Sequence, residues 1–275
     1  MGQFRDVCEE AARAGGRVLR EMRGRINPRE KSPKDLVTDA DFASQEAIRG
    51  VLAGAFPEHE FLGEEGGEGQ RATTRGAALS DPDGYCWVVD PLDGTLNYAR
   101  QLPNYSVSVA LRRGDRVVCG VVYDPILEEC FAAELGEGVV LNGGPIGPSG
   151  CERVEQGLIA ASLPAQVARG SREIDRFVAV MCEAQAIRRM GSAALNLCYV
   201  AMGRLDAYWA TCVKVWDIAA GQLIVTEAGG VLSHVDGGAF DLERPQFVAA
   251  ATPPLHQELV RLLRRASELE GATGH

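Results

Sequence analysis

Residues 87–97 read WVVDPLDGTLN and place two aspartates at the end of an apolar run. Asp90 and Asp93 would repel each other, because two like charges about 4 Å apart cost about 4 kcal/mol at an effective dielectric of ~20. A divalent cation removes this repulsion, and Mg²⁺ prefers oxygen ligands and shares its sites with phosphate groups. The pattern therefore favours Asp90 and Asp93 as bridging metal ligands, with the carbonyl of Leu92 facing the same place.

The residues that follow predict a phosphate site beside these ligands. Pro91 fixes the exit of the chain from the strand. Gly94 and Thr95 then indicate a turn into a helix, where free backbone N–H groups bind a phosphate oxygen well. The hydroxyl group of Thr95 is placed to orient a water molecule.

Two other interpretations of this stretch exist. D-P-x-D-G is also a common surface turn, although the buried WVV before it and the T-x-N after it favour a site. The haloacid-dehalogenase phosphatases carry D-x-D-G-T, with a nucleophilic aspartate two residues before the second one. Pro91 holds that position here, and proline cannot attack phosphorus, so the sequence excludes that mechanism.

Acidic residues occur in a similar setting at two further places. Glu64 and Glu65 follow the apolar pair at 61–62, and Asp217 follows Trp216 where a helix is expected to begin. A solvated loop would account for the glutamates alone, and a helix N-cap for Asp217 alone. Together with Asp90 and Asp93, they form an ordered set that chance explains poorly.

Elements that could position these side chains follow from the apolar periodicity. Helices with roughly one apolar face, or with cap signals at their ends, alternate with short strands over most of the chain. Asp39 or Asp41 is the predicted N-cap of the second helix, and Ser192 is that of the fourth. Gly, Pro and Ser predict a turn-rich break over 141–150. The predicted helices are 4–25, 39–55, 172–186, 192–203, 217–229 and the tail from 254, and the predicted strands are 35–38, 85–90, 105–113, 116–125, 129–135, 158–164, 186–191, 205–210, 231–235 and 246–251.

The composition limits the fold and the partners. A chain of 275 residues with 46% hydrophobic content can form one large domain or two closely packed halves. We expect a single α/β (α+β) domain over 1–275, with halves of about 1–150 and 151–275. A net charge of −10 disfavours nucleic acid and anionic lipid as partners.

We expect a cytoplasmic protein without a membrane partner. The first residues lack the apolar core of a signal peptide, and no apolar run is long enough to span a bilayer. The eight cysteines include no C-x-x-C pair, so buried, reduced thiols are expected. The four histidines lack zinc spacing. Only three lysines occur against 25 arginines, and Lys31, Lys34 and Lys214 all lie just before an acidic motif.

In order along the chain, DLVTDAD, GEE, WVVDPLDGTLN and VWDIAAGQLIVTEAGG closely resemble the signatures of the inositol monophosphatase family, the Mg²⁺-dependent, lithium-sensitive phosphatases. The GSAALNLCYVAMG helix, the LNGGPI turn and the GGAFDL ending match as well, so the resemblance covers about residues 5–265. It implies a layered α-β-α-β-α sandwich. Because members of this family are often homodimers, a homodimer is expected as well.

The resemblance also implies a ligand set for two or three Mg²⁺ ions, with Mn²⁺ as the other candidate. Glu64, Asp90 and the carbonyl of Leu92 are expected to hold one ion. Asp90, Asp93 and Asp217 are expected to hold a second. A third, weaker ion is expected on Glu64.

The remaining implied roles concern the water and the substrate. Thr95 and Asp41 are expected to orient or deprotonate the attacking water, with Glu64 as the third member of the catalytic set and Glu65 assisting through water. Substrate is expected to contact the metal ligands Asp93 and Asp217 as well as the backbone at 94–95. The segment of Gly191, Ser192 and Ala193 flanks the sugar in the family.

One position departs from the family pattern. Inositol-specific members usually carry a glutamate seven residues before the aspartate of the W-D motif, and this chain has Ala210 there. Lost contacts to substrate hydroxyl groups reduce discrimination between similar alcohols.

The expected function is therefore hydrolysis of inositol 1-phosphate, EC 3.1.3.25, or of a related polyol or sugar phosphate. Fructose 1,6-bisphosphate, histidinol phosphate, a 3′-phosphoadenosine nucleotide and NADP are alternative substrates for the same machinery. A relative that binds phosphate ligands without turnover is the alternative of another class.

Overall fold

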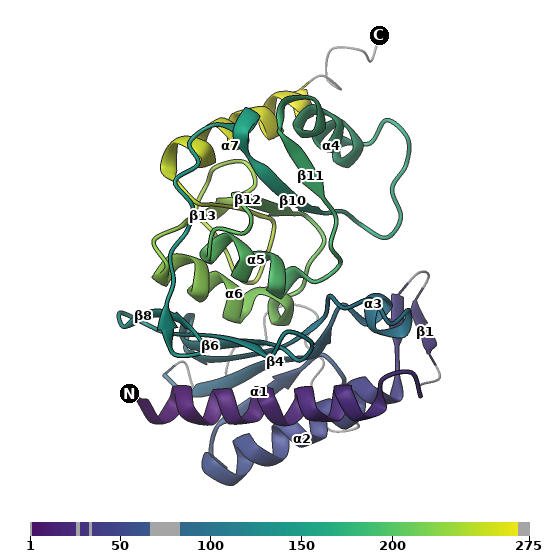
Figure 1. The fold of residues 1–275 in the computed structure, drawn as a ribbon, viewed down its shortest axis with the longest axis vertical. Coiled ribbons are helices and arrows are strands. Elements are labelled where there is room, and N and C mark those ends of the chain that lie inside the picture. Colours follow the sequence, from purple (N-terminus) through teal and green to yellow (C-terminus); the bar gives the residue numbers. More distant parts are fainter. Residues whose placement is uncertain (1, 26–27, 33–34, 67–82, 269–275) are drawn as a thin grey trace.

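The computed structural model describes residues 2–25, 28–32, 35–66 and 83–268. These residues form five layers in the order helix, sheet, helix, sheet, helix (Figure 1). The helices are α1 Gly2–Met22, α2 Asp39–Ala55, α3 Thr95–Ala99, α4 Arg172–Glu183, α5 Ala193–Ala201, α6 Val215–Glu227 and α7 Pro253–Glu268, with a 3₁₀ turn at Val154–Gln156. The strands are β1 Arg29–Ser32, β2 Asp35–Val37, β3 Glu60–Gly63, β4 Tyr85–Asp93, β5 Ser106–Arg113, β6 Arg116–Asp124, β7 Glu129–Glu134, β8 Gly138–Leu141, β9 Gly144–Pro145, β10 Leu158–Ser162, β11 Ala186–Arg188, β12 Ala207–Ala210, β13 Val231–His234 and β14 Phe247–Ala250. The layered α-β-α-β-α sandwich expected from the sequence is confirmed.

Two sheets carry the fold. The larger has the strand order β3-β4-β5-β6-β7-β8-β9 and is antiparallel except for the β3–β4 pair. The smaller has the order β11-β10-β12-β14-β13, with β10 parallel to both of its neighbours. Helices α1 and α2 cover the outer face of the larger sheet, and α4 and α7 cover that of the smaller one (Figure 1). A separate hairpin pairs β1 with β2.

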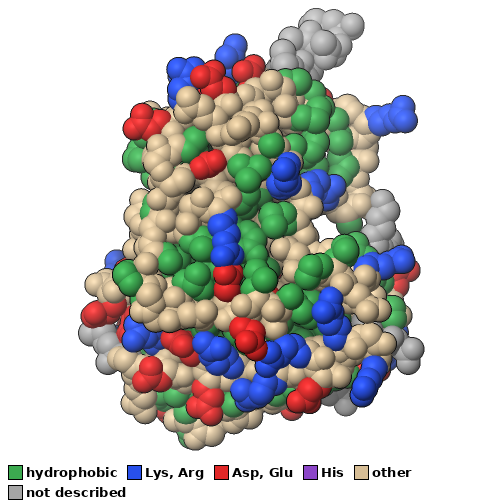
Figure 2. Space-filling model, viewed as in Figure 1, with side chains coloured by type: hydrophobic (Ala, Val, Ile, Leu, Met, Phe, Trp, Pro, Cys, Tyr) green, Lys and Arg blue, Asp and Glu red, His purple; other side chains and the backbone are tan. Residues whose placement is uncertain are grey.

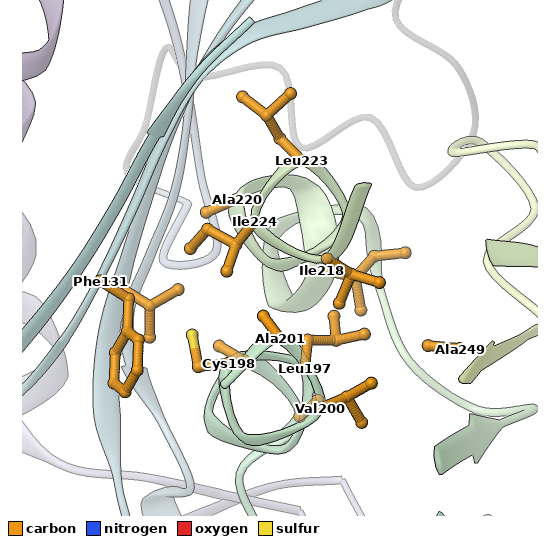
Figure 3. Packing of buried hydrophobic residues seen from close by; sticks show 14 of the residues in the cluster. Phe131, Leu197, Cys198, Val200, Ala201, Ile218, Ala220, Leu223, Ile224 and Ala249 are labelled. Carbon is orange, nitrogen blue, oxygen red and sulfur yellow. The ribbon is translucent and has the colours of Figure 1, made fainter. Parts of the chain in front are cut away.

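The middle layer, α5 and α6, fills the space between the two sheets. In Figure 3, Phe131 of β7 packs against this layer from one side and Ala249 of β14 faces it from the other. Both helices are apolar on nearly every face because both lie in the core. Gly221 allows their close approach, since a Cβ there would lie 2.5 Å from Leu197 Cδ1.

Strand β4 shows why the strands of the larger sheet have apolar residues at successive positions in the sequence. Trp87 and Val89 pack toward α1 and α2, whereas Val88 packs toward the middle layer. A sheet buried on both faces needs apolar residues at every position instead of an alternating pattern. The predicted strand ended at Asp90, whereas the observed strand continues to Asp93.

Some predictions about local structure were wrong, and the four-residue strands β1, β3 and β8 were not predicted. The N-cap of α2 is Thr38 and neither Asp39 nor Asp41. The expected break over 141–150 overlaps β8 and contains β9, because its glycines and proline form a hairpin turn at the sheet edge. Cys182 and Cys212 are exposed, although the cysteines were expected to be buried. Among the described residues, none of the helices has the length and apolarity needed to span a membrane.

Candidate active site

Asp90 and Asp93 face the same side of the larger sheet because β4 contains a bulge. Asp90 pairs with Ser108 and Asp93 pairs with Ser106, so three steps along β4 match two along β5. In a regular strand, residues three apart point to opposite faces. The extra residue restores the common direction, and both carboxylates face the middle helical layer.

The start of α5 holds Asp93. Its Oδ2 atom accepts hydrogen bonds from Ser192 Oγ at 2.5 Å and from the Ala194 N–H at 2.7 Å. Ser192 also caps α5 as predicted, and its Oγ lies 3.2 Å from Ser106 Oγ. Burial raises the pKa of Asp93 to about 6, and these donors oppose that rise. The donors lie about a hundred residues further along the chain, which the sequence pattern did not indicate.

Asp90 is the most crowded carboxylate of the site. Its side chain is almost completely buried, with 1% of its surface exposed. Burial raises its pKa well above the usual range, and the charges of Glu64, Asp93 and Asp217 raise it further. The Leu92 N–H, 3.0 Å from Asp90 Oδ1, opposes the shift. Acidic groups from three separate segments therefore converge on one buried side chain.

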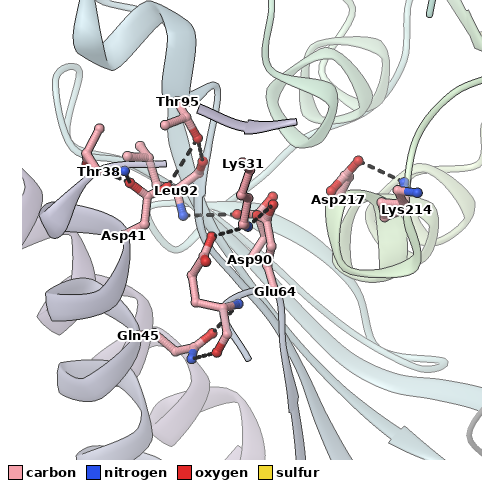
Figure 4. A network of polar contacts seen from close by, with 11 residues as sticks. Lys31, Thr38, Asp41, Gln45, Glu64, Asp90, Leu92, Thr95, Lys214 and Asp217 are labelled. Carbon is pink, nitrogen blue, oxygen red and sulfur yellow. Dashed lines mark hydrogen bonds and ion pairs between the residues drawn. The ribbon is translucent and has the colours of Figure 1, made fainter. Parts of the chain in front are cut away.

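Lys31 of β1 lies between the two glutamates that follow β3 (Figure 4). Its Nζ atom is 3.2 Å from Glu64 Oε1 and 2.5 Å from Glu65 Oε1. Burial raises the pKa of Glu64 to about 7, although Lys31 opposes the rise. Gln45 of α2 fixes the turn, because its side chain bonds both the N–H and the carbonyl of Glu65. The site has an internal cation, whereas Lys34 lies outside the described residues.

Asp41 links the start of α2 to Thr95. Its Oδ2 atom accepts hydrogen bonds from the Thr38 N–H at 2.8 Å and from Thr38 Oγ1 at 2.6 Å. Its Oδ1 atom is 3.2 Å from Thr95 Oγ1, which also lies 3.1 Å from the Leu92 carbonyl. Burial raises the pKa of Asp41 to about 6. The predicted pairing of Thr95 with Asp41 is present in the geometry.

Asp217 lies in the first turn of α6 and approaches the site from the middle layer. Its Oδ2 atom accepts a hydrogen bond from the N–H of Lys214, which is the N-cap of this helix. Burial raises the pKa of Asp217 well above its usual range, as do the charges of Asp93 and Glu64. A capping role alone does not explain a carboxylate that approaches two others.

A tether that sequence reasoning missed joins the two sides of the site. Asn97 Nδ2 lies 2.8 Å from the carbonyl oxygen of Met190 and 2.7 Å from that of Asn104, and it donates to both. Asn104 Nδ2 donates to the same Met190 oxygen at 3.0 Å. Gly191 follows with φ +89°, and a Cβ there would lie 2.7 Å from Asn97 Nδ2. The T-x-N of the motif points to Asn97 but not to its partner Met190, which lies 93 positions further along the chain.

The remaining predicted positions lie around this cluster. Gly94 has φ +99° and is the N-cap of α3, as the predicted turn requires. Ala193 begins α5 beside Ser192. Ala210 ends β12 and is fully buried in the core of the middle layer.

The donor set suits a hard cation, since it consists of carboxylates and a carbonyl oxygen. In the part of the chain that the structure describes, no three His, Cys, Asp or Glu side chains are already arranged to hold a metal ion. Asp93 and Asp217 direct one oxygen each toward backbone N–H groups, and Lys31 contacts Glu64. These contacts use one oxygen of each carboxylate and leave the other for a cation, and the mutual repulsion at Asp90 favours an added cation.

Comparison with known proteins shows which family has this fold and these residues. The family model described as inositol monophosphatase family matches residues 2–268. A relative named Nus factor SuhB from Pasteurella multocida is 38% identical over 96% of this chain and 97% of its own length. An inositol-1-monophosphatase from Mesorhizobium japonicum is 36% identical over 89% and 90%. The solved structure of a Thermotoga maritima IMPase has a TM-score of 0.85 and 30% identity, and the match covers 98% of this chain and 99% of that one.

The fold and the site define a layered α+β phosphatase scaffold with an acidic centre. The chain belongs to the inositol monophosphatase family.

Proposed function

We propose that the chain is a Mg²⁺-dependent phosphomonoesterase of the EC 3.1.3.25 type. Its substrate is inositol 1-phosphate or a related polyol or sugar phosphate, and its products are the alcohol and phosphate. The observation that carries this proposal is the convergence of Glu64, Asp93 and Asp217 on the buried Asp90. Such a cluster is unfavourable by itself and suits a metal-dependent reaction on an anionic substrate.

In this proposal the ligands form two main groups. Glu64, Asp90 and the Leu92 carbonyl would hold one ion, and Asp90, Asp93 and Asp217 would hold another, with a weaker third ion on Glu64. Ions held there would supply the positive charge that makes a nearby water more acidic and that offsets negative charge developing on the phosphate ester.

Thr95 and Asp41 position the nucleophile. Thr95 Oγ1 donates its hydrogen to Asp41 or to the Leu92 carbonyl, so its oxygen is free to accept a hydrogen bond from a water. With a pKa of about 6, Asp41 is ionised at neutral pH and can receive a proton through Thr95. Glu65, paired with Lys31, supports this side of the site through water.

The substrate lies between α3 and the start of α5. The backbone N–H groups of Gly94 and Thr95 bind the phosphate, and the segment of Gly191, Ser192 and Ala193 flanks the alcohol. Ala210 supplies no acceptor for a hydroxyl group, so we propose a broader range of alcohols than an inositol-specific enzyme accepts.

A panel of phosphate esters tests this function directly. Metal-free protein is prepared with a chelator, and phosphate release is measured on addition of Mg²⁺ or Mn²⁺. Inositol 1-phosphate is compared with fructose 1,6-bisphosphate, histidinol phosphate, a 3′-phosphoadenosine nucleotide and NADP. We expect metal-dependent turnover of inositol 1-phosphate; turnover of none of the esters would refute the proposal and favour a phosphate-binding protein without activity.

Other properties complete the proposal. We propose a cytoplasmic homodimer that lithium inhibits. Fractionation, light scattering of the purified chain and a lithium titration of turnover measure these properties separately.

Relatives named Nus factor SuhB favour a second candidate function, which is that of a Nus factor. In that function the chain acts through its folded surface and needs no turnover. A host that lacks this chain separates the two functions when it is supplied with the Asp93→Asn variant. Full rescue by a variant without turnover would favour the second function, and failure of rescue would favour the enzyme.

A further inference from the structure

A groove between α1 and the turns that follow β6 and β8 lies away from the carboxylate cluster and carries the opposite charge. Its volume is about 750 Å³. Four arginines and two glutamates line it, which leaves two positive charges in a chain whose net charge is −10. In Figure 2, Lys and Arg side chains lie among Asp and Glu side chains over the lower part of the molecule, where α1 is found. The lining residues are Arg5, Glu9, Arg13, Arg17, Arg20, Tyr123, Glu128, Val140, Asn142 and Gly143.

The charged side chains form a stripe along one face of α1. Residues 5, 9, 13, 17 and 20 are spaced by four, four, four and three positions, and such spacing places side chains in a row on a helix. Successive members of the row are about 6 Å apart along the axis, and the row extends about 22 Å from Arg5 to Arg20.

The floor and the far wall of the groove are preformed. Tyr123 lies directly against the α1 backbone, since a Cβ on Gly16 would be 2.5 Å from its ring. The guanidinium of Arg13 lies over that ring at 5.0 Å. On the far wall, Asn142 accepts a hydrogen bond from the Cys130 N–H and donates one to the Glu128 carbonyl, so two neighbouring turns are fixed to each other.

The arginines of the stripe differ in how far they are neutralised. Arg20 forms an ion pair with Glu128, and Arg5 lies 4.0 Å from Glu9. Arg17 is exposed and makes no hydrogen bond or ion pair with the residues that the structure describes. Arg13 and Arg17 therefore form the positive centre of the groove.

The dimensions favour an extended polypeptide over a compact ligand. Alternate side chains of an extended chain lie about 6.6 Å apart, close to the spacing of the arginines, and about seven residues span the row. A small phosphate compound cannot reach both ends. A polynucleotide would place charge along the whole row, where it would meet Glu9 and Glu128, and the acidic remainder of the molecule would repel its flanks.

The geometry points to this groove as a docking site for an extended acidic segment of a partner protein. Asp or Glu side chains at alternate positions of the segment face Arg13 and Arg17, where guanidinium and carboxylate groups pair well. A non-acidic residue of the segment faces Glu9. The inference does not depend on the proposed enzymatic function.

Fluorescence anisotropy tests the site on the full chain with a labelled peptide about nine residues long, which has Asp at positions 1, 5 and 7 and Ser elsewhere, so that Ser faces Glu9. We expect saturable binding that weakens as salt is added. The Arg17→Glu/Arg20→Glu variant should raise Kd by about tenfold or more. The control variant Arg169→Glu/Arg244→Glu has the same net charge, changes two exposed arginines outside the groove, and should bind like the parent chain.

Several results would overturn the inference: no peptide binding, equal loss of affinity in the control variant, or tighter binding of the matching Asn and Ser peptide. Groove-dependent binding of an oligouridylate or an anionic vesicle, without peptide binding, would reject the acidic peptide as the occupant. Circular dichroism and unchanged ester turnover check the fold of the double variant. If it misfolds, Arg17→Ala, which removes an exposed side chain, is measured against Arg169→Ala.

Discussion

At the scale of single residues, the site is a group of acids that the fold holds in an unfavourable state. Asp90, Asp93 and Glu64 all have raised pKa values, and burial is the first cause for each. Hydrogen bonds from helix ends and the ammonium of Lys31 compensate only in part. Its chemistry therefore needs added positive charge.

Replacing Asp93 by Asn is expected to abolish turnover and to leave the fold intact. The amide oxygen can still accept hydrogen bonds from Ser192 and the Ala194 N–H, but it supplies no charge to a metal. We expect a loss on the order of 10³-fold or more in phosphate release, with a melting temperature equal to or above that of the parent. Asp115→Asn, at an exposed turn, is the matched control. Undiminished turnover would contradict the metal assignment.

The stability of the metal-free protein should fall as pH rises. Asp41 and Asp93 have pKa values of about 6 and Glu64 of about 7 in the folded chain, above the usual carboxylate range of about 4. The folded state therefore binds more protons than the unfolded state between about pH 4 and 7, and the free energy of unfolding decreases across that window.

Thermal unfolding with a chelator measures this dependence. We expect a melting temperature a few degrees lower near pH 7.5 than near pH 5, and Mg²⁺ should reduce the difference because it stabilises the ionised carboxylates. Asp41→Asn should flatten the slope. A melting temperature that rises over this interval without metal would show that the acids do not control stability.

Residue-level prediction from the sequence depended on residue type more than on contacts. The acidic residues and Thr95 could be singled out because their types and order are chemically unusual. The Asn97–Met190 contact and the Ser192–Asp93 bond could not, because each joins segments about a hundred positions apart. Only a folded chain brings such partners together.

At the scale of elements, the link between α3 and the loop before α5 positions the two sides of the site. Gly191→Ala should lower both stability and turnover, because a Cβ would press on Asn97. Gly229→Ala is a matched control, since Gly229 has the same φ of +89° and open space around it. Both variants should cost about 1–2 kcal/mol for the left-handed backbone.

Only Gly191→Ala should also change catalysis, by about tenfold or more in kcat/KM as the start of α5 shifts. Denaturant unfolding and initial-rate kinetics measure the two effects. Equal kinetics in the two variants would mean that the tether has only a structural role.

Most elements were predictable because their apolar periods are clear, but their ends were less so. At Thr38, two aspartates follow the capping threonine and gave the competing signal. β9 was missed because Gly-Pro is a turn sequence, and β8, β1 and β3 were missed because each is only four residues long. The bulge in β4 leaves no trace in the hydrophobic pattern, since β4 is buried on both faces.

At the scale of the whole molecule, the middle layer unites the two sheets. Helices α5 and α6 pack core residues against both sheets. The first turn of α5 donates a hydrogen bond to Asp93, and the first turn of α6 contains Asp217. We therefore propose that residues 1–275 form one domain, in which the two halves of the sequence do not fold separately.

Scanning calorimetry should give one unfolding transition with equal calorimetric and van't Hoff enthalpies. Leu197→Ala, in the centre of the layer, should shift the entire transition and cost about 2–5 kcal/mol. Val178→Ala, at an exposed position on α4, is the control and should have little effect. Two resolved transitions, of which Leu197→Ala moves one, would indicate two domains.

The extra residue in β4 limits which sequence changes between Asp90 and Asp93 the site can tolerate. A sheet assigns its inner and outer sides by odd and even positions, and the added residue reverses that parity between Asp90 and Asp93. Side chains at positions 91 and 92 can change while the parity is kept, but the loss of a single residue there would aim one acid at the layer of α1 and α2. In this segment, length is more tightly constrained than composition.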